Sequence, residues 1–192
     1  MRRILSFLVC VCLFTGSVFA QYSFEHLSVN NGLSQSTVLA IHQDSRGYMW
    51  FGTRDRLNRY DGRNIKVYKS DASDKSTIST DNYIYAITED RFGRLWIGTQ
   101  NGVNCYSPRT DSFERINHSP SDQKSLSSNA VLSIHVAESG RVWLGTNGGL
   151  SMLKNAKSRV FTNYYDKDGL GDNMVYAIFE DSKKNVWVGT TN

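Results

Sequence analysis

The stretch Trp96-Ile97-Gly98-Thr99 decides the fold, because the chain repeats it. All 4 tryptophans of the 192 residues stand first in such a tetrapeptide, which reads Trp-hydrophobic-Gly-Thr. The other copies begin at Trp50, Trp143 and Trp187, so the motif returns every 44 to 47 residues. A repeat of this length indicates an array of similar supersecondary units, each of which buries its faces against its neighbours.

Alignment on the tryptophan shows how much of the unit is repeated. Nine residues before it stands an isoleucine in each copy, and twelve before it a valine or isoleucine. Six before it is an aspartate in three copies, with Ala137 in the third unit. Three before it is a glycine in three copies, with Lys184 in the fourth unit. Agreement at so many positions predicts one structure that is repeated four times.

Each unit has the pattern of a series of short strands. Apolar runs such as Val38 to Ile41 are typical of strands that are buried on both faces. An Asp-x-x-Gly turn follows, then the tryptophan strand, then a turn such as Asn101-Gly102 or Asn147-Gly148 that favours a type I′ hairpin. A third strand and a more polar fourth strand complete the unit. Four antiparallel strands per repeat are typical of a β-propeller blade. The sequence therefore predicts an all-β fold, a partial β-propeller of about 3.5 four-stranded antiparallel blades.

The residues that recur in every unit are interpreted as structural. Large aromatic side chains dominate core burial, so a tryptophan at the same position of each blade is expected in the core between blades. The alternative is that these tryptophans stack on a sugar. The structural set comprises Trp50, Trp96, Trp143, Trp187, Gly52, Gly98, Gly145 and Gly189.

Residues 1–20 carry the pattern of a secretory signal peptide. Arg2 and Arg3 precede an apolar stretch, and small residues end it at Ala20. We therefore expect export to the periplasm and cleavage after Ala20. Cleavage leaves Cys105 as the one cysteine of the mature chain, so no internal disulfide is expected.

Residues 21–192 are expected to form the partial propeller. A leading strand over 22–27 resembles the fourth strand of a blade, and the blades are expected at about 33–68, 78–116, 126–164 and 170–192, the last one incomplete. A leading fourth strand is a device by which propellers close their ring. We therefore expect the chain to be the N-terminal part of a longer protein. Further blades or a second copy would be the partner that closes the ring.

Charge and residue pattern argue against several functions. The net charge of +4 is scattered through turns with no basic stripe, so no nucleic-acid binding is expected. His42 and His135 occupy equivalent positions in non-adjacent blades, and each Asp-x-x-Gly turn offers one carboxylate, which is too few ligands for calcium. No metal, no cofactor and no catalytic residues are expected, so the chain itself is not expected to be an enzyme.

The segments Gly32-Leu33-Ser34, Ile87 to Thr99 and Asn147 to Leu150 together resemble the two-component regulator propeller repeat. The resemblance covers essentially all of the mature chain, and the departures Arg56, Ala137 and Lys184 fall at turns. It implies the periplasmic sensor region of a hybrid two-component histidine kinase, in which a membrane-spanning helix and the kinase follow the propellers. It also implies an oligosaccharide ligand whose binding biases the distant kinase. Membrane contact would come only through such downstream segments.

Variable loops on a rigid scaffold are where ligand binding usually occurs. The turn after each tryptophan strand differs among the units, and its neighbourhood supplies the candidate ligand-binding residues Arg54, Arg56, Arg59, Asn101 and Asn147. The arginines can pair with a carboxylate or sulfate, whereas solvated surface arginines are the alternative. Two other functions stay open at this stage: a propeller enzyme of the lyase or glycosidase type, and a non-catalytic periplasmic interaction scaffold.

Overall fold

The computed structural model describes residues 23–79 and 83–192, so the expected signal peptide lies outside the described residues. They form three four-stranded antiparallel sheets and one two-stranded sheet, which we call blades one to four. Blade one contains β1 (Val38–Gln43), β2 (Met49–Thr53), β3 (Leu57–Tyr60) and β4 (Ile65–Tyr68). Blade two contains β5 (Ile84–Glu89), β6 (Leu95–Thr99), β7 (Gly102–Ser107) and β8 (Ser112–Ile116). Blade three contains β9 (Val131–Val136), β10 (Val142–Thr146), β11 (Gly149–Leu153) and β12 (Phe161–Tyr164), and blade four contains β13 (Val175–Glu180) and β14 (Val186–Thr190). The short 3-10 helices η1 (Val29–Asn31) and η2 (Asp166–Asp168) precede blades one and four.

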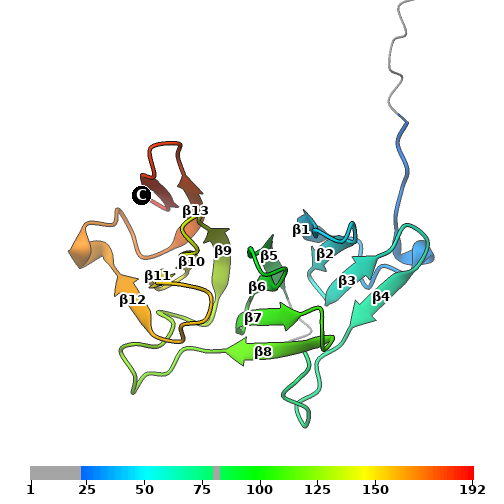
Figure 1. Ribbon diagram of the computed structural model, residues 1–192, viewed down its shortest axis with the longest axis horizontal. Coiled ribbons are helices and arrows are strands. Elements are labelled where there is room, and N and C mark those ends of the chain that lie inside the picture. The colour runs from blue at the N-terminus through cyan, green and yellow to red at the C-terminus, as the bar shows by residue number, and fades with distance from the viewer. Residues whose placement is uncertain (1–22, 80–82) are drawn as a thin grey trace, which may run out of the picture.

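The blades are arranged around a common centre, with their strands in sequence order from the inside outward. In Figure 1 the first strands β1, β5, β9 and β13 lie toward the middle, while β4, β8 and β12 lie outside. Each first strand also contacts the first strand of the next blade. This confirms the predicted all-β partial propeller. Within the described residues, no helix has the length and apolar character needed to cross a membrane.

Tryptophans fill the junctions between blades. Trp50 and Trp96 have no solvent exposure. Trp50 packs against Tyr106 of blade two with ring centroids 5.0 Å apart, and Trp96 lies in a buried cluster with Val131 of blade three. Trp187 is 61% exposed, because no described blade follows β14 to cover it. Successive blades are thus joined by side chains of the tryptophan strand.

The repeated aspartate holds both its turn and the tryptophan. The carboxylate of Asp90 accepts hydrogen bonds from the backbone N–H groups of Phe92 (2.9 Å) and Arg94 (3.1 Å), which fix the turn. Its second oxygen accepts the indole N–H of Trp96 at 3.1 Å. Equivalent indole bonds join Asp44 to Trp50 and Asp181 to Trp187. The sequence predicted only the turn, and the indole bond adds a reason for the six-residue spacing.

Blade three lacks this bond, because Ala137 replaces the aspartate. The Trp143 Nε1 atom is buried and has no hydrogen-bond partner among the described residues. The turn itself is retained, since Gly140 N donates to the Ala137 carbonyl at 2.8 Å and Ala137 N donates to the Arg141 carbonyl at 2.9 Å. The substitution therefore removes the acceptor of the tryptophan and keeps the backbone conformation.

The glycine of the tetrapeptide lets the next blade approach. A Cβ on Gly98 would lie 2.8 Å from the Val131 carbonyl oxygen, and one on Gly145 would lie 2.7 Å from the Val175 carbonyl oxygen. Both distances are shorter than real Cβ contacts allow. The first residue of each inner strand therefore packs directly on the glycine of the preceding blade.

The threonine of the tetrapeptide locks the following turn. In blade two the Thr99 hydroxyl accepts the Asn101 N–H at 2.9 Å and donates to the Gly102 carbonyl at 2.9 Å. Only Gly102 of this turn has a positive φ, at 90°, and in blade three only Gly149 does, at 127°. A type I′ turn needs positive φ at both central residues, so the predicted type I′ turns at Asn101-Gly102 and Asn147-Gly148 are wrong. In both turns the left-handed glycine follows the two residues that lie between the strands, which are Gln100-Asn101 in blade two and Asn147-Gly148 in blade three.

One further expectation is wrong, and a second one stays a prediction. The side chains of β1 alternate between partly buried and exposed, with Ile41 62% exposed, so burial on both faces is wrong for this strand. The reason is that β5 covers one side of β1 and no described element covers the other. Residues 23–28 form no strand, and Phe24 is 94% exposed. The leading strand over 22–27 stays a prediction.

Candidate functional site

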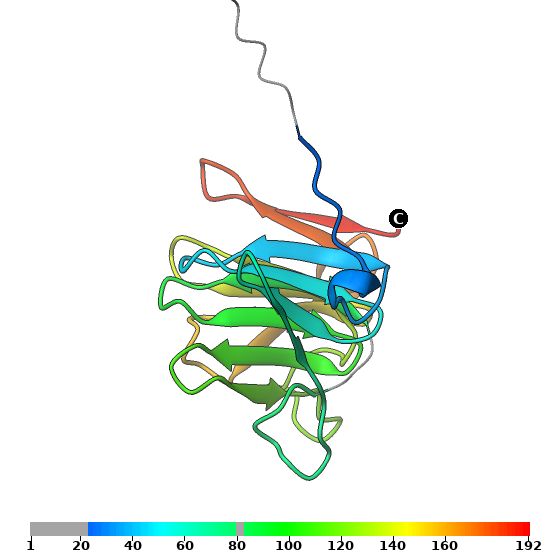
Figure 2. The ribbon, with the colours of Figure 1, turned by 90° about the vertical axis from the view of Figure 1, so that its right-hand side faces the viewer.

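The turns of the blades gather on two opposite faces of the molecule (Figure 2). One face, which we call the Asp-turn face, carries the turns between first and second strands and the loops between third and fourth strands. The other, which we call the Thr-turn face, carries the turns between second and third strands and the loops that connect blades. The sequence analysis expected the ligand at the Thr-turn face.

Three of the five predicted ligand residues occupy equivalent turns of the Thr-turn face. Arg54, Asn101 and Asn147 are all exposed. The Arg54 guanidinium lies 5.8 Å from the centre of the Tyr83 ring. The two asparagines contact the loops that precede their blades: the Asn101 amide donates to the Ser79 carbonyl at 3.5 Å, and the Asn147 Oδ1 accepts the Ser128 hydroxyl at 2.6 Å. Their hydrogen bonds are those of turn residues.

The two remaining arginines differ in position. Arg56 is in the same turn as Arg54 and has a φ of 97°, the conformation that glycine adopts in blades two and three. Arg59 lies on β3 opposite Trp50, away from this turn. Its guanidinium is 4.7 Å from the centre of the Tyr48 ring and donates to the Tyr106 hydroxyl at 3.4 Å. The structure therefore places Arg59 in the packing between blades one and two, apart from the other four.

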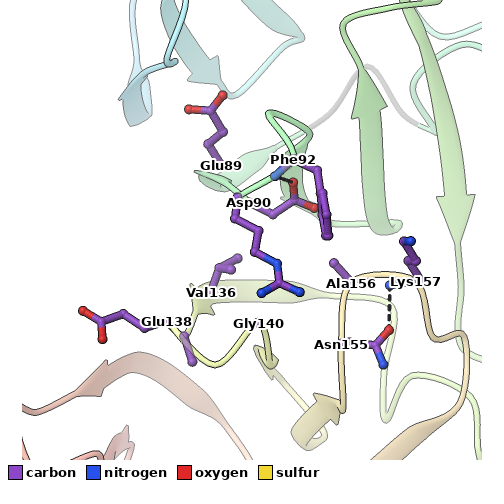
Figure 3. Close-up of a pocket in the computed structure, with 11 residues that line it drawn as sticks. Glu89, Asp90, Phe92, Val136, Glu138, Gly140, Asn155, Ala156 and Lys157 are labelled. Atoms are coloured by element: carbon purple, nitrogen blue, oxygen red, sulfur yellow. Dashed lines mark hydrogen bonds between the residues drawn. The ribbon is translucent and has the colours of Figure 1, made fainter.

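The Asp-turn face contains a cleft between blades two and three, which we call the 2–3 cleft (Figure 3). Its volume is about 420 Å³, within the range of small-molecule sites. The β5–β6 turn forms one wall and the β9–β10 turn forms the other, with the β11–β12 loop at the end. Residues that carry the chemistry are Glu89, Asp90, Arg91, Phe92, Glu138 and Lys157.

An exposed aromatic ring between cations marks this cleft. Phe92 is 52% exposed. The Arg91 guanidinium lies 5.0 Å from its ring centre, and the Lys157 ammonium lies 5.5 Å from it. Both cationic side chains are exposed, and no ion pair among the described residues includes either one. The cleft thus presents two positive charges beside an apolar ring.

The carboxylates around the cleft are already bound. Asp90 holds Trp96 and its own turn. Glu89 accepts two hydrogen bonds from Ser45, and Glu138 pairs with the Lys184 ammonium at 2.5 Å. In Figure 3 the Glu89 and Glu138 carboxylates lie on one side of the cleft, away from Phe92 and Lys157. The carboxylates of the cleft thus have protein partners, and the charge without an ion-pair partner in the described residues is positive.

Other reactive side chains are elsewhere or are inert. Burial lowers the pKa of His42, although the Glu89 and Asp44 carboxylates oppose this shift, so the imidazole is neutral near pH 7. Burial raises the pKa of the Cys105 thiol to about 11, which leaves it protonated and unreactive. The described residues contain no group of three or more His, Cys, Asp or Glu side chains that could hold a metal ion.

Sequence reasoning missed Arg91, Phe92 and Lys157. Arg91 and Phe92 occupy columns of the aligned repeat that vary, as the turn after the tryptophan does. A signal was available in the departures of blade three. Val136 stands where blades two and four have glutamate, and Ala137 stands where the other blades have aspartate. Both losses of negative charge fall beside the 2–3 cleft.

Repeated blades joined through tryptophan and glycine define the protein as a β-propeller built from one recurring unit. The family described as the two component regulator propeller matches residues 32–55, 79–101, 125–148 and 169–192, one segment in each blade. The chain belongs to the two-component regulator propeller family. This confirms the family resemblance and places the chain among the sensor propeller domains of two-component systems.

Individual relatives agree with this assignment. The chain is 42% identical over 60 residues to histidine kinase P4 of Formosa agariphila, a match that covers 31% of this chain and 4% of that protein. It is similar to the extracellular domain of a putative hybrid two component system from B. thetaiotaomicron, with a TM-score of 0.79 and 29% identity over 86% of this chain and 24% of that one. A virginiamycin B lyase from Staphylococcus aureus shares the fold, with a TM-score of 0.60 and 16% identity over 82% of this chain and 50% of that one. The chain thus spans a small part of its sensor relatives, and the lyase shows the fold alone.

Proposed function

We propose that this chain is the ligand-sensing propeller segment of a two-component sensor, that it is exported to the periplasm, and that it responds to an oligosaccharide. The observation that carries the proposal is the presence of four two-component regulator propeller repeats. They build a rigid scaffold with an open cleft at a blade junction. A rigid scaffold with ligand groups in its loops is the usual arrangement of a recognition domain.

Signalling requires that the ligand distinguish two states of the sensor. A ligand shifts an equilibrium only by its differential affinity for the two states. A site between two blades suits this requirement, because its walls come from different sheets and a ligand in it contacts both. Binding would favour one arrangement of the propeller, and the kinase of the sensor would read that arrangement.

The test compares a strain that carries the gene with a strain from which it is deleted. Cells of each are exposed to a panel of oligosaccharides, and transcription is measured genome-wide. We expect one class of oligosaccharide to induce a set of genes in the first strain alone. If every oligosaccharide response survives the deletion, the sensing function is refuted.

A second measurement separates the proposal from a propeller enzyme. The purified protein is incubated with the inducing oligosaccharide, and the products are analysed by mass spectrometry. We expect the oligosaccharide to be recovered intact. Cleavage or elimination products would identify a glycosidase or lyase instead.

A further inference from the structure

The three blade junctions of the Asp-turn face differ in one respect. At the junction of blades one and two, the Ser45 N–H and hydroxyl donate to the Glu89 carboxylate at 2.8 and 2.6 Å. At the junction of blades three and four, the Lys184 ammonium joins Glu138 at 2.5 Å and Glu180 at 3.6 Å. In both cases the residue five positions before one tryptophan bonds a residue in the first hairpin of the next blade, Glu89 at the end of β5 or Lys184 in the β13–β14 turn. We call this contact the latch.

In the part of the chain that the structure describes, the junction of blades two and three has no latch. Arg91 occupies the position of Ser45, but the position of Glu89 in the next blade is Val136, which cannot accept a hydrogen bond. A Cβ on Gly140 would lie 3.6 Å from the Arg91 guanidinium carbon, so this side chain does reach across to blade three. Other contacts hold blades two and three together: Arg94 donates a hydrogen bond to the Ala156 carbonyl at 2.8 Å, and Arg159 forms an ion pair with Glu114. The 2–3 cleft lies at this junction, and a smaller cleft of about 210 Å³ lies at the latched junction of blades three and four.

Both departures of blade three act in the same direction. Val136 and Ala137 each stand where other blades carry an acid, and each lines the 2–3 cleft. Together they leave blade three with two carboxylates fewer than the equivalent positions of blades two and four carry. Lys157 adds a second cation from the β11–β12 loop. An unpaired guanidinium is well suited to a planar or tetrahedral oxyanion, because its donors form a fork.

We propose that the 2–3 cleft binds an acidic saccharide, with Arg91 and Lys157 pairing to a carboxylate or sulfate group and Phe92 packing against the sugar ring. The inference rests on the proposed function, since that function supplies the saccharide. It adds the charge of the ligand and the position of its site. It also places the site on the Asp-turn face rather than among Arg54, Arg56, Asn101 and Asn147.

The experiment measures binding by calorimetry to the protein as its gene encodes it. The probes are a galacturonate tetramer, a sulfated galactose tetramer and a neutral glucose tetramer, so the carboxylate and sulfate sources are compared directly. We expect one acidic probe to bind, with an affinity that falls as salt is raised. Arg91→Ala and Lys157→Ala should each weaken its binding about tenfold or more. Arg63→Ala is the matched control, because it removes the same charge from an exposed loop of blade one and should leave binding unchanged.

A gain of charge provides the second test. Val136→Glu restores the acid found at this position in blades two and four, and it should pair with Arg91 and close the cleft. We expect this variant to melt at or above the wild-type temperature and to lose binding of the acidic probe. A folded Val136→Glu protein that binds as the wild type does would overturn the proposal.

The possible results of these experiments separate the acidic-saccharide site from the proposed oligosaccharide sensing. Binding of the neutral tetramer alone would refute the acidic site and leave oligosaccharide sensing intact. If an acidic probe binds the Arg91→Ala and Lys157→Ala variants as tightly as it binds the wild type, the site lies elsewhere and the inference is overturned. Binding of no probe would overturn it as well, while the transcription experiment would still decide whether the protein senses a saccharide.

Discussion

Replacement of Ala137 by aspartate should stabilise blade three, because it supplies the acceptor that Trp143 lacks. The backbone at Ala137 matches that of the other aspartate turns: Gly140 N donates to the Ala137 carbonyl at 2.8 Å, and Gly93 N donates to the Asp90 carbonyl at 2.9 Å. An aspartate side chain therefore fits without rearrangement. It should accept the Trp143 indole N–H and the turn amides, as Asp90 does for Trp96.

The magnitude follows from the bonds gained and the charge buried. An unsatisfied buried donor costs about 1–3 kcal/mol. Against this gain stands the desolvation of a new carboxylate, which its hydrogen bonds only partly offset. We expect Ala137→Asp to raise the free energy of unfolding by about 1 kcal/mol. Asp90→Ala is the reciprocal change. It removes four hydrogen bonds and leaves the buried indole N–H of Trp96 without an acceptor. It should lower the free energy of unfolding by about 3 kcal/mol.

Urea unfolding of the protein as its gene encodes it measures both changes. Because repeat proteins unfold in steps, hydrogen exchange of the β9 and β10 amides should confirm that the gain belongs to blade three. Ala137→Asn is the control for shape, since an amide offers one acceptor without the charge, and it should give a smaller gain. A neutral or destabilising Ala137→Asp, together with an Asp90→Ala loss below about 0.5 kcal/mol, would show that the indole bond does not hold the blade.

Three further predictions concern packing, pH and export. Gly98→Ala should lower the free energy of unfolding by about 1–3 kcal/mol, because the new methyl group meets the Val131 carbonyl; a denaturant melt that matches wild type would contradict the close approach. Burial would raise the pKa of Asp111, but hydrogen bonds, from Lys66 above all, outweigh it and hold the pKa at about 2. Because the pKa of Asp111 is lower in the folded protein than in the unfolded chain, the ionised side chain stabilises the fold by about 1 kcal/mol, a figure reduced for its exposure. This stabilisation is present above about pH 4 and is lost as the pH falls toward 2. An Asp111→Asn protein whose melting temperature changes with acid as that of the wild type does would refute this. Protein from the periplasmic fraction should begin at Gln21 on N-terminal sequencing, and a start at Met1 would exclude the signal peptide.

The fold was predictable because its determinants are local and repeated. A tryptophan, a glycine and a turn aspartate at fixed spacing specify strands, turns and blade contacts, and four copies make the pattern visible. The details that failed depend on context. The type I′ turns at Asn101 and Asn147 were wrong because the threonine hydroxyl closes a turn in which a single glycine, Gly102 or Gly149, is left-handed.

The candidate site was harder to predict, because it is formed between blades. Arg91 and Lys157 are 66 positions apart in the sequence, and nothing local links them to Phe92. Only the packing of blade two on blade three brings both cations to one ring. Lys184 illustrates the same point. It departs from glycine at a left-handed position, with a φ of 69°, and its ammonium joins Glu138 to Glu180 across a junction that the aligned sequence does not reveal.

The 2–3 cleft is the ligand site that we propose for this propeller. Hydrogen exchange with and without the oligosaccharide that induces transcription tests it most directly, since exchange maps the contact onto the chain. We expect slower exchange over residues 89–93, 136–140 and 154–158, and unchanged exchange over residues 54–56, 100–102 and 147–149. Protection confined to those three turns of the Thr-turn face, with none at the 2–3 cleft, would contradict it.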